Sequence, residues 1–362
     1  MGIFNEFFKK EKPVFTGSRF GFGRGPTAST GDGDGGGGLS LSGGNVEYTL
    51  GNNKIHVFTS PGTLSNSSGS NITVEYVLIA GGGGSAGDAG GGGGAGGVIS
   101  SIPGIMPVTR SPLTMNNGQS VTVTIGAGGP ASGAGQPDSP AYPGGRSGGN
   151  GEDTLFAGPA GNSVRALGGG GGGQEGNTGP SNLPVNTSSG GRGGSGGGSR
   201  GGRPESNNSN GLDNQGNSGS EAVAPRSGVP GIGGGGGGGA GGSASTTVDG
   251  GVGIQLPPAF RDNTQPTAVK GDPGTYGGLP AAPTPGGWWF AGGGGGYTDS
   301  NYPLPGPVGG TYGQGGSGGG GKGANPPEPI SPQPGQANTG GGAGGQGTGG
   351  SGIAFFMYPK LG

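Results

Sequence analysis

Few residues in this chain have the types and spacing that catalysis needs. The 362 residues include one histidine, His56, and no cysteine, so the sequence offers no thiolate metal site, no disulfide framework and no nucleophile–base pair. His56 stands in a segment that alternates like a β-strand, where a packed or surface imidazole is expected. The acidic residues are scattered. We therefore predict no enzyme, no catalytic residue, no metal and no cofactor.

Three strings that resemble ligand-binding motifs are explained better by composition. Residues 316–322 spell GxxxxGK, but Gly323 stands where a phosphate-binding loop needs Ser or Thr. Residues 32–34 give two carboxylates in Asp-Gly-Asp, which is a fragment of a calcium loop. The arginines of residues 192–203 lack interleaved aromatic residues. With 17 basic and 19 acidic residues the net charge is −2, so we predict no nucleic-acid partner.

Aromatic residues around a run of five glycines are the best candidates for binding. Two tryptophans and a phenylalanine precede this run, and three tyrosines follow it: Trp288, Trp289, Phe290, Tyr297, Tyr302 and Tyr312. Exposed rings beside Asn and Asp suit stacking on sugars or capture of a protein loop. The alternative is that Trp288 or Trp289 packs as a small core at the end of the glycine region.

A second aromatic group lies at the N-terminus. Six of the 12 phenylalanines fall within the first 22 residues: Phe4, Phe7, Phe8, Phe15, Phe20 and Phe22. Residues 25–44 follow as a Gly-rich linker. We interpret residues 1–24 as a docking peptide that inserts into a partner; the alternative is that it folds back on its own domain. This segment lacks the apolar stretch of a signal peptide, and no segment is long and apolar enough to span a bilayer.

Glycine determines the body of the protein. The chain has 109 glycines and 32 prolines, and glycines recur in runs at residues 81–84, 90–94, 168–173, 233–239 and 292–296. Composition alone predicts disorder, whereas runs of similar length that follow apolar residues favour order. Ordered glycine needs a hydrogen bond for each backbone group, and packed polyproline-II helices supply it because their N–H and C=O groups all point outward. We favour this polyglycine-II arrangement over disorder.

Strand patterns stand at both ends of the glycine region. They cover residues 46–50, 54–59, 72–80, 98–99 and 121–125, and one isolated strand follows at residues 353–358. A lone strand is not stable, so we expect the last one to pair with the N-terminal strands. The predicted fold is mostly β with almost no helix. Residues 45–129 and 340–362 form a small β-domain, and residues 130–339 form an inserted polyglycine-II body with variable loops.

The order of these elements resembles a known family. HVFTSPGTL, VEYVLIAGGGG, AGGVIS, NNGQSVTVTIGAGG and GGSGIAFFMY together resemble the glycine-rich domain of tailed-phage fibre and virion proteins. The resemblance covers residues 48–129 and 340–358. The wider class is similar to the adhesins of T-even-like phages, in which polyglycine-II helices carry loops that recognise the host surface.

The resemblance implies a structural protein on the surface of a phage particle, made in the host cytoplasm without a signal peptide. We expect a tail-fibre or tip adhesin whose loops bind a bacterial surface glycan or outer-membrane protein. Its N-terminal peptide would attach to other virion proteins, and a homotrimer would suit a fibre. A head or neck decoration protein without a receptor is the alternative. The non-periodic loops argue against a free antifreeze or silk-like protein.

Overall fold

A computed structural model describes residues 39–87, 90–132, 147–158, 163–173, 190–200, 210–212, 214–221, 233–244, 248–274, 276, 287–297, 312–324 and 333–360. The predicted docking peptide and the linker up to residue 38 lie outside the described residues. Among the described residues, strands dominate, and the helical elements are two 3₁₀ turns, η3 (Pro258–Phe260) and η4 (Thr267–Val269). The mostly β class with almost no helix is confirmed.

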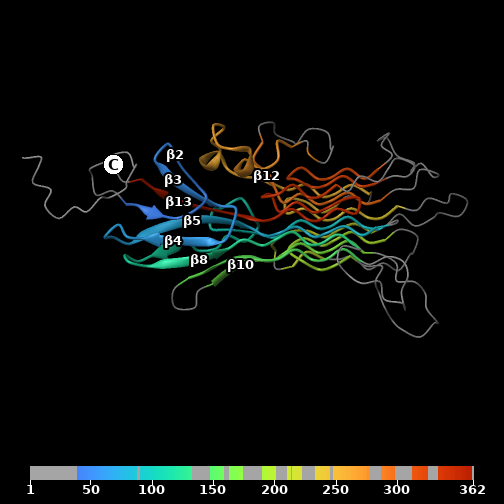
Figure 1. Ribbon diagram of the computed structural model, residues 1–362, viewed down its shortest axis with the longest axis horizontal. Helices are drawn as coiled ribbons and strands as arrows, with labels where there is room; N and C mark the ends of the chain where they lie inside the picture. Colours follow the sequence, from blue (N-terminus) through green and yellow to red (C-terminus); the bar gives the residue numbers. More distant parts are fainter. Residues whose placement is uncertain are drawn as a thin grey trace, which may run out of the picture. The chain divides into compact units, whose positions relative to one another are not determined.

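The strands form two antiparallel sheets and a two-stranded ribbon (Figure 1). The six-stranded sheet consists of β2 (Val46–Leu50), β3 (Asn53–Phe58), β13 (Ile353–Pro359), β5 (Ile72–Ile79) and β6 (Val98–Ser100) in that order, with β7 (Leu113–Met115) also paired to β5. The five-stranded sheet has the order β1 (Leu41–Ser42), β4 (Gly62–Asn66), β8 (Ser120–Thr124), β9 (Thr154–Ala157) and β10 (Ser163–Ala166). The ribbon pairs β11 (Ile254–Gln255) with β12 (Trp289–Phe290).

The C-terminal strand β13 is a central strand of the larger sheet. It lies between β3 and β5, with Phe356 opposite His56 on one side and Tyr76 on the other. The predicted return of the last strand to the N-terminal strands is therefore confirmed. A central position also explains why residues 353–358 are apolar almost without interruption, because both faces of the strand are covered.

Each face of the six-stranded sheet packs against a different layer. On one face Phe356 meets Phe58 and Phe156 edge-to-face, with ring centroids 5.6 and 5.8 Å apart, in the core shared with the five-stranded sheet. On the other face Phe355 meets Phe260 and Phe290 at 5.9 and 5.6 Å. Alternate side chains of one strand thus join two separate cores.

The second layer, described at residues 254–274, 276 and 287–290, differs from the sequence prediction. We assigned these residues to the variable loops of the body at residues 130–339, and the prolines among them are consistent with that interpretation. In the structure the segment carries β11, η3, η4 and β12, and it buries Leu256, Phe260 and Val269 against the sheet. A few well-placed apolar residues are enough to dock a segment that looks polar on average.

The boundary of the β-region also differs from the prediction. Strands β9 and β10 fall inside residues 130–339, which we assigned to the glycine body, yet they extend the five-stranded sheet through pairing of β9 with β8. Phe156 of β9 is buried in the core between the sheets. Both strands are four residues long, which is too short for a clear alternating pattern.

Glycine stretches continue directly from the strands and lie side by side (Figure 1). Residues 80–86 follow β5, and every third N–H group of this stretch donates to the same neighbouring stretch. Ala80, Gly83 and Ala86 donate to the carbonyl oxygens of Gly97, Gly94 and Gly91 at 2.8–3.1 Å. The N–H groups between them donate to residues 149–152 and 347–350. A repeat of three with three partners differs from a helix, which bonds within itself, and from a strand, which has a repeat of two.

The stretch at residues 90–97 is surrounded by six others. Its N–H groups donate to residues 167–173, 235–238 and 340–343, and its carbonyl groups accept from residues 80–86, 195–198 and 294–297. These residues are buried, and no glycine among them has φ in the left-handed region. Buried backbone groups are thus satisfied by neighbouring stretches, as burial requires.

The spacing between stretches leaves no room for a side chain. A Cβ atom added to Gly91 would lie 2.0 Å from the carbonyl oxygen of Gly198, and one on Gly93 would lie 2.1 Å from that of Gly83. For Gly92 the distance to the Gly294 oxygen is 2.3 Å. Successive residues of this stretch are therefore closed off by three different neighbours, which explains why glycine fills the run.

Replacing Gly93 by Ala should lower the free energy of unfolding by about 3 kcal/mol, because the methyl group must push apart two hydrogen-bonded stretches. The control is Gly104→Ala, where the Cβ would meet open space at a φ of +82° and where only backbone strain of about 1 kcal/mol is expected. Urea unfolding measures both. Equal midpoints for the two variants would contradict the close packing.

Candidate functional site

The aromatic residues predicted for receptor binding do not all lie together. Trp288, Trp289 and Phe290 are buried, with 1 %, 6 % and 0 % of their surface exposed. Trp288 and Phe290 belong to the core under the second face of the larger sheet, and the Trp288 Nε1–H donates to Asn263 Oδ1 at 3.3 Å. This burial corresponds to the packing alternative, so we do not retain these three residues as receptor contacts.

Tyr297 and Tyr312 are half-buried and lie at the end of glycine stretches. The N–H group of Tyr297 donates to Gly90, and its carbonyl oxygen accepts from Gly234. The ammonium group of Lys322 lies 3.8 Å from the centre of the Tyr312 ring, a cation–π contact. Tyr302 and the phenylalanines at positions 4, 7, 8, 15, 20 and 22 lie outside the described residues.

Backbone hydrogen bonds connect several stretches at one end of the glycine array. Ser132 donates to Ser85, and Gly173 donates to Gly198. Further bonds at this end join Ser199 to Ser220 and Gly234 to Tyr297. Hydrogen bonds thus join several stretches at this end, while residues 80–86 and 90–97 are continuous at their opposite ends with β5 and β6.

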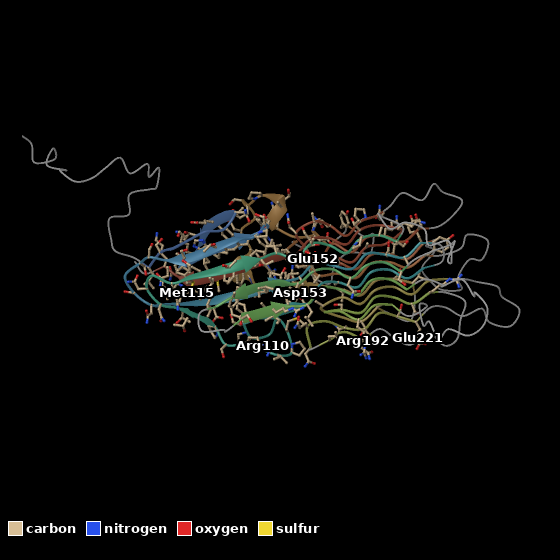
Figure 2. The ribbon with its side chains drawn as sticks, turned by 60° about the horizontal axis from the view of Figure 1, so that its bottom comes forward. Arg110, Met115, Glu152, Asp153, Arg192 and Glu221 are labelled. Carbon is tan, nitrogen blue, oxygen red and sulfur yellow. The ribbon has the colours of Figure 1, made fainter. Side chains whose placement is uncertain are left out.

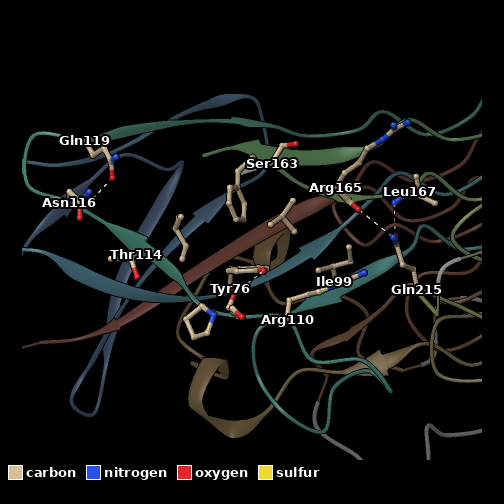
Figure 3. A pocket seen from close by; sticks show the side chains of 15 residues that line it. Tyr76, Ile99, Arg110, Thr114, Asn116, Gln119, Ser163, Arg165, Leu167 and Gln215 are labelled. Carbon is tan, nitrogen blue, oxygen red and sulfur yellow. Dashed lines mark hydrogen bonds between the residues drawn. The ribbon is translucent and has the colours of Figure 1, made fainter. Parts of the chain in front are cut away.

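One pocket lies beside the outer strand β10 (Figure 3). Its volume is about 930 Å³, and its lining comes from segments far apart in the chain: Tyr76 of β5, Leu113 of β7, Phe156 of β9 and Gln215 from the glycine region. These four side chains are buried. Residues Thr114 and Asn116 add exposed polar groups at the other side of the pocket.

Two arginines line this pocket but differ in their partners. Arg165 forms an ion pair with Asp153, and Figure 3 shows its side chain extending away from the pocket. Arg110 is exposed and lies next to Tyr76 in the same view. Burial raises the pKa of Tyr76 to about 12, with Arg110 opposing the shift. The Tyr76 hydroxyl, which donates to the Ser111 carbonyl at 3.1 Å, thus stays neutral at physiological pH. The sequence does not predict this pocket, because its lining residues come from distant segments and form no local pattern.

A smaller pocket of about 350 Å³ lies over the second layer, lined by Asn263, Lys270 and Trp288 among others. Trp288 has a φ of 62°, an unusual conformation for a bulky residue. Its N–H group donates to the Lys270 carbonyl at 2.9 Å. This hydrogen bond explains the unusual conformation of Trp288, because it joins the residue before β12 to the residue after η4.

The buried carboxylate of Asp272 holds the second layer against the glycine array. Asp272 is fully buried, and its Oδ1 accepts from the N–H groups of Gly274 and Tyr276 at 2.9 and 3.1 Å. Its Oδ2 accepts from Gly318 and Gly319 at 2.8 and 3.1 Å. Hydrogen bonds to a charged acceptor are stronger than neutral ones, so this residue is a strong connection between the two regions.

His56 is a buried residue of the six-stranded sheet. Its ring is stacked on Tyr358, with centroids 5.7 Å apart, and its Nδ1 lies 2.5 Å from the Gly43 carbonyl oxygen and 3.3 Å from a Glu47 carboxylate oxygen. Burial lowers the pKa of His56, while the Gly43 carbonyl and Glu47 act in the opposite direction. A structural imidazole fits this environment.

Of the strings singled out in the sequence, residues 32–34 and Arg203 lie outside the described residues. In residues 316–322 the Gly321 N–H donates to Gly342 and the Lys322 side chain covers Tyr312, so the string is part of the glycine array. Within the described ranges, no group of three or more His, Asp or Glu residues is placed to hold a metal ion. None of the described helical elements is long and apolar enough to cross a bilayer. No protein-family model and no curated protein matches the chain.

Replacing Asp272 by Asn should lower the free energy of unfolding by about 3 kcal/mol, because the amide nitrogen would face backbone N–H donors and the charge would be lost. Asp262→Asn is the control, since its carboxylate is exposed and accepts from Thr264; we expect a small change there. Thermal and urea unfolding report both variants. A wild-type midpoint for Asp272→Asn would contradict the role of the carboxylate.

The protein should lose stability as the pH falls below about 6.5, the ordinary pKa of histidine. Because the folded state lowers the pKa of His56, the unfolded state binds the proton more readily. Stability is therefore complete above that pH and declines below it, by at most about 1.4 kcal/mol per pH unit. Urea unfolding at pH 7.5 and 5.5 measures the loss. A His56→Gln variant should show a smaller difference between the two pH values; an equal difference would disprove the assignment to His56.

Proposed function

We propose that the glycine stretches are polyglycine-II helices and that they form a rigid scaffold in a structural protein of a phage particle. The helix type is supported by the repeat of three in the N–H partners of residues 80–86 and by the six neighbours of residues 90–97. A polyproline-II helix has three residues per turn and directs its N–H groups outward. The absence of left-handed φ values among residues 90–97 is consistent with this geometry.

Such an array is stiff because its parts are fixed at one end by the sheets. Residues 80–86 continue from β5 and residues 90–97 lead into β6, and both strands are buried in the six-stranded sheet. Ordering a residue costs about 1–2 kcal/mol of backbone entropy, which hydrogen bonds of about 1 kcal/mol each offset only in part. The strands and the two apolar cores supply the rest.

The favoured role is host recognition by a tail-fibre or tip adhesin. The observation that carries it is the backbone pairing at one end of the array, where Tyr297 is bonded to Gly90 and Gly234 at the end of a glycine stretch. Segments that start and finish on a rigid support can bind a partner with little loss of conformational freedom. Tyr297 and Tyr312, half-buried at this end, are the aromatic residues we keep as candidates for the receptor contact.

The N-terminal peptide of residues 1–24, with its six phenylalanines, would attach the protein to other virion components. The second partner would be a bacterial surface glycan or an outer-membrane protein. A trimer is compatible with a fibre. These assignments rest on the sequence resemblance and on the described array together.

Purified protein added to host cells should bind them and reduce adsorption of the phage that carries it. The matched control is a chain in which residues 298–311 are replaced by a Gly–Ser linker of the same length, which should bind less while unfolding at the same urea concentration. Electron microscopy with an antibody against the native chain should place label at fibre ends. Label spread over the head, together with no effect on adsorption, would reject the adhesin in favour of a decoration protein.

A further inference from the structure

The pocket beside β10 combines an apolar floor with a polar rim (Figure 3). Tyr76 and Phe156 form the floor as an edge-to-face pair, with ring centroids 5.0 Å apart and planes at 79°, and Leu113 adds an aliphatic wall. These residues give the pocket an apolar floor, against which the C–H groups of a sugar ring can pack. The volume of about 930 Å³ lies in the range of small-molecule sites, which extends to about 1,000 Å³.

The rim supplies hydrogen-bonding groups in fixed places. Gln215 is 4 % exposed, and its Oε1 accepts from the Leu167 N–H at 2.8 Å while its Nε2 donates to the Arg165 carbonyl at 3.4 Å. Because an amide nitrogen carries two hydrogens, one N–H remains for a ligand. The hydroxyl of Thr114 and the amide of Asn116 are exposed across the pocket. Hydroxyl-rich molecules are recognised by such groups.

The charge of the lining is positive. Its charged residues are Arg110 and Arg165, and no aspartate or glutamate lines the pocket. Arg165 is paired with Asp153, whereas Arg110 has no ion pair among the described residues. The backbone of Arg110 is fixed, since its N–H donates to the Ser100 carbonyl at 2.9 Å. A guanidinium group held at the edge of a pocket is suited to a carboxylate, which it can bind through two parallel hydrogen bonds.

We propose that this pocket binds an acidic saccharide, with the sugar ring against the apolar floor and its carboxylate at Arg110. Gln215, Thr114 and Asn116 would contact its hydroxyl groups. The site is separate from the end of the glycine array that carries the proposed receptor contact, because it lies between β10, the outer strand of one sheet, and β7. It would bind its ligand whether or not the protein is an adhesin.

The experiment is isothermal titration of the full chain with uronate- and sialate-containing oligosaccharides, each compared with its carboxyl-reduced form. We expect binding of at least one acidic oligosaccharide and at least tenfold weaker binding of its reduced form. Arg110→Gln should weaken binding about tenfold, and Thr114→Glu should abolish it by placing a negative charge on the rim. Arg192→Gln, an equal change of charge at an exposed residue of the glycine region (Figure 2), should bind as the wild type does.

Both Arg110 and Thr114 are exposed, so their variants should unfold at the wild-type urea concentration and remain informative. The proposal fails if no acidic oligosaccharide binds, if the reduced forms bind equally, or if Arg110→Gln binds like the wild type. An intact acidic polysaccharide with the same repeat distinguishes a surface polymer from a free sugar. The chain with residues 298–311 replaced by a linker should keep this binding. A failure of the saccharide proposal can therefore be distinguished from a failure of the adhesin proposal.

Discussion

The structure depends on hydrogen bonds between backbones that have no side chains. Glycine loses more conformational freedom on folding than other residues and gains no apolar burial in return. Order then requires partners for the backbone groups, and residues 90–97 bond to six surrounding stretches, with a partner for every N–H group from Gly91 to Gly97. The same close packing leaves no room for a Cβ atom. At Gly93, for example, an added Cβ would lie 2.1 Å from the carbonyl oxygen of Gly83. One constraint thus explains both the composition and the packing.

The sheets solve a problem that the glycine stretches cannot solve alone. Side-by-side stretches need a defined register, and residues 80–86 and 90–97 obtain it from β5 and β6, with which they are continuous. β13 is central to this arrangement, because it closes the larger sheet and contributes Phe355 and Phe356 to two separate cores. Asp272 adds a polar connection by holding the second layer to residues 318 and 319. The conventional cores are small, but they fix the positions of many more residues than they contain.

Much of the β-region could be predicted from the sequence, since residues 72–79 and 353–359 carry strong strand patterns and the isolated last strand needs a partner. The short strands β9 and β10 could not, because four residues give little periodicity. The second layer could not be predicted because its sequence is polar on average, although Phe260 and Val269 are fully buried in the structure. The sequence left two roles open for Trp288, binding or packing in a small core, and its burial corresponds to packing. The pocket beside β10 is a product of tertiary structure, since Tyr76, Phe156 and Gln215 are unrelated by any local pattern.

The central claim is that the glycine stretches are ordered by hydrogen bonds to their neighbours. Amide hydrogen exchange on the full chain, read residue by residue or on short peptides, tests it directly. The amides of residues 90–97 should exchange as slowly as those of β13, because both can open only when the array and the sheet separate. Exchange of residues 90–97 at the rate of an unstructured glycine peptide, with β13 still protected, would contradict the account.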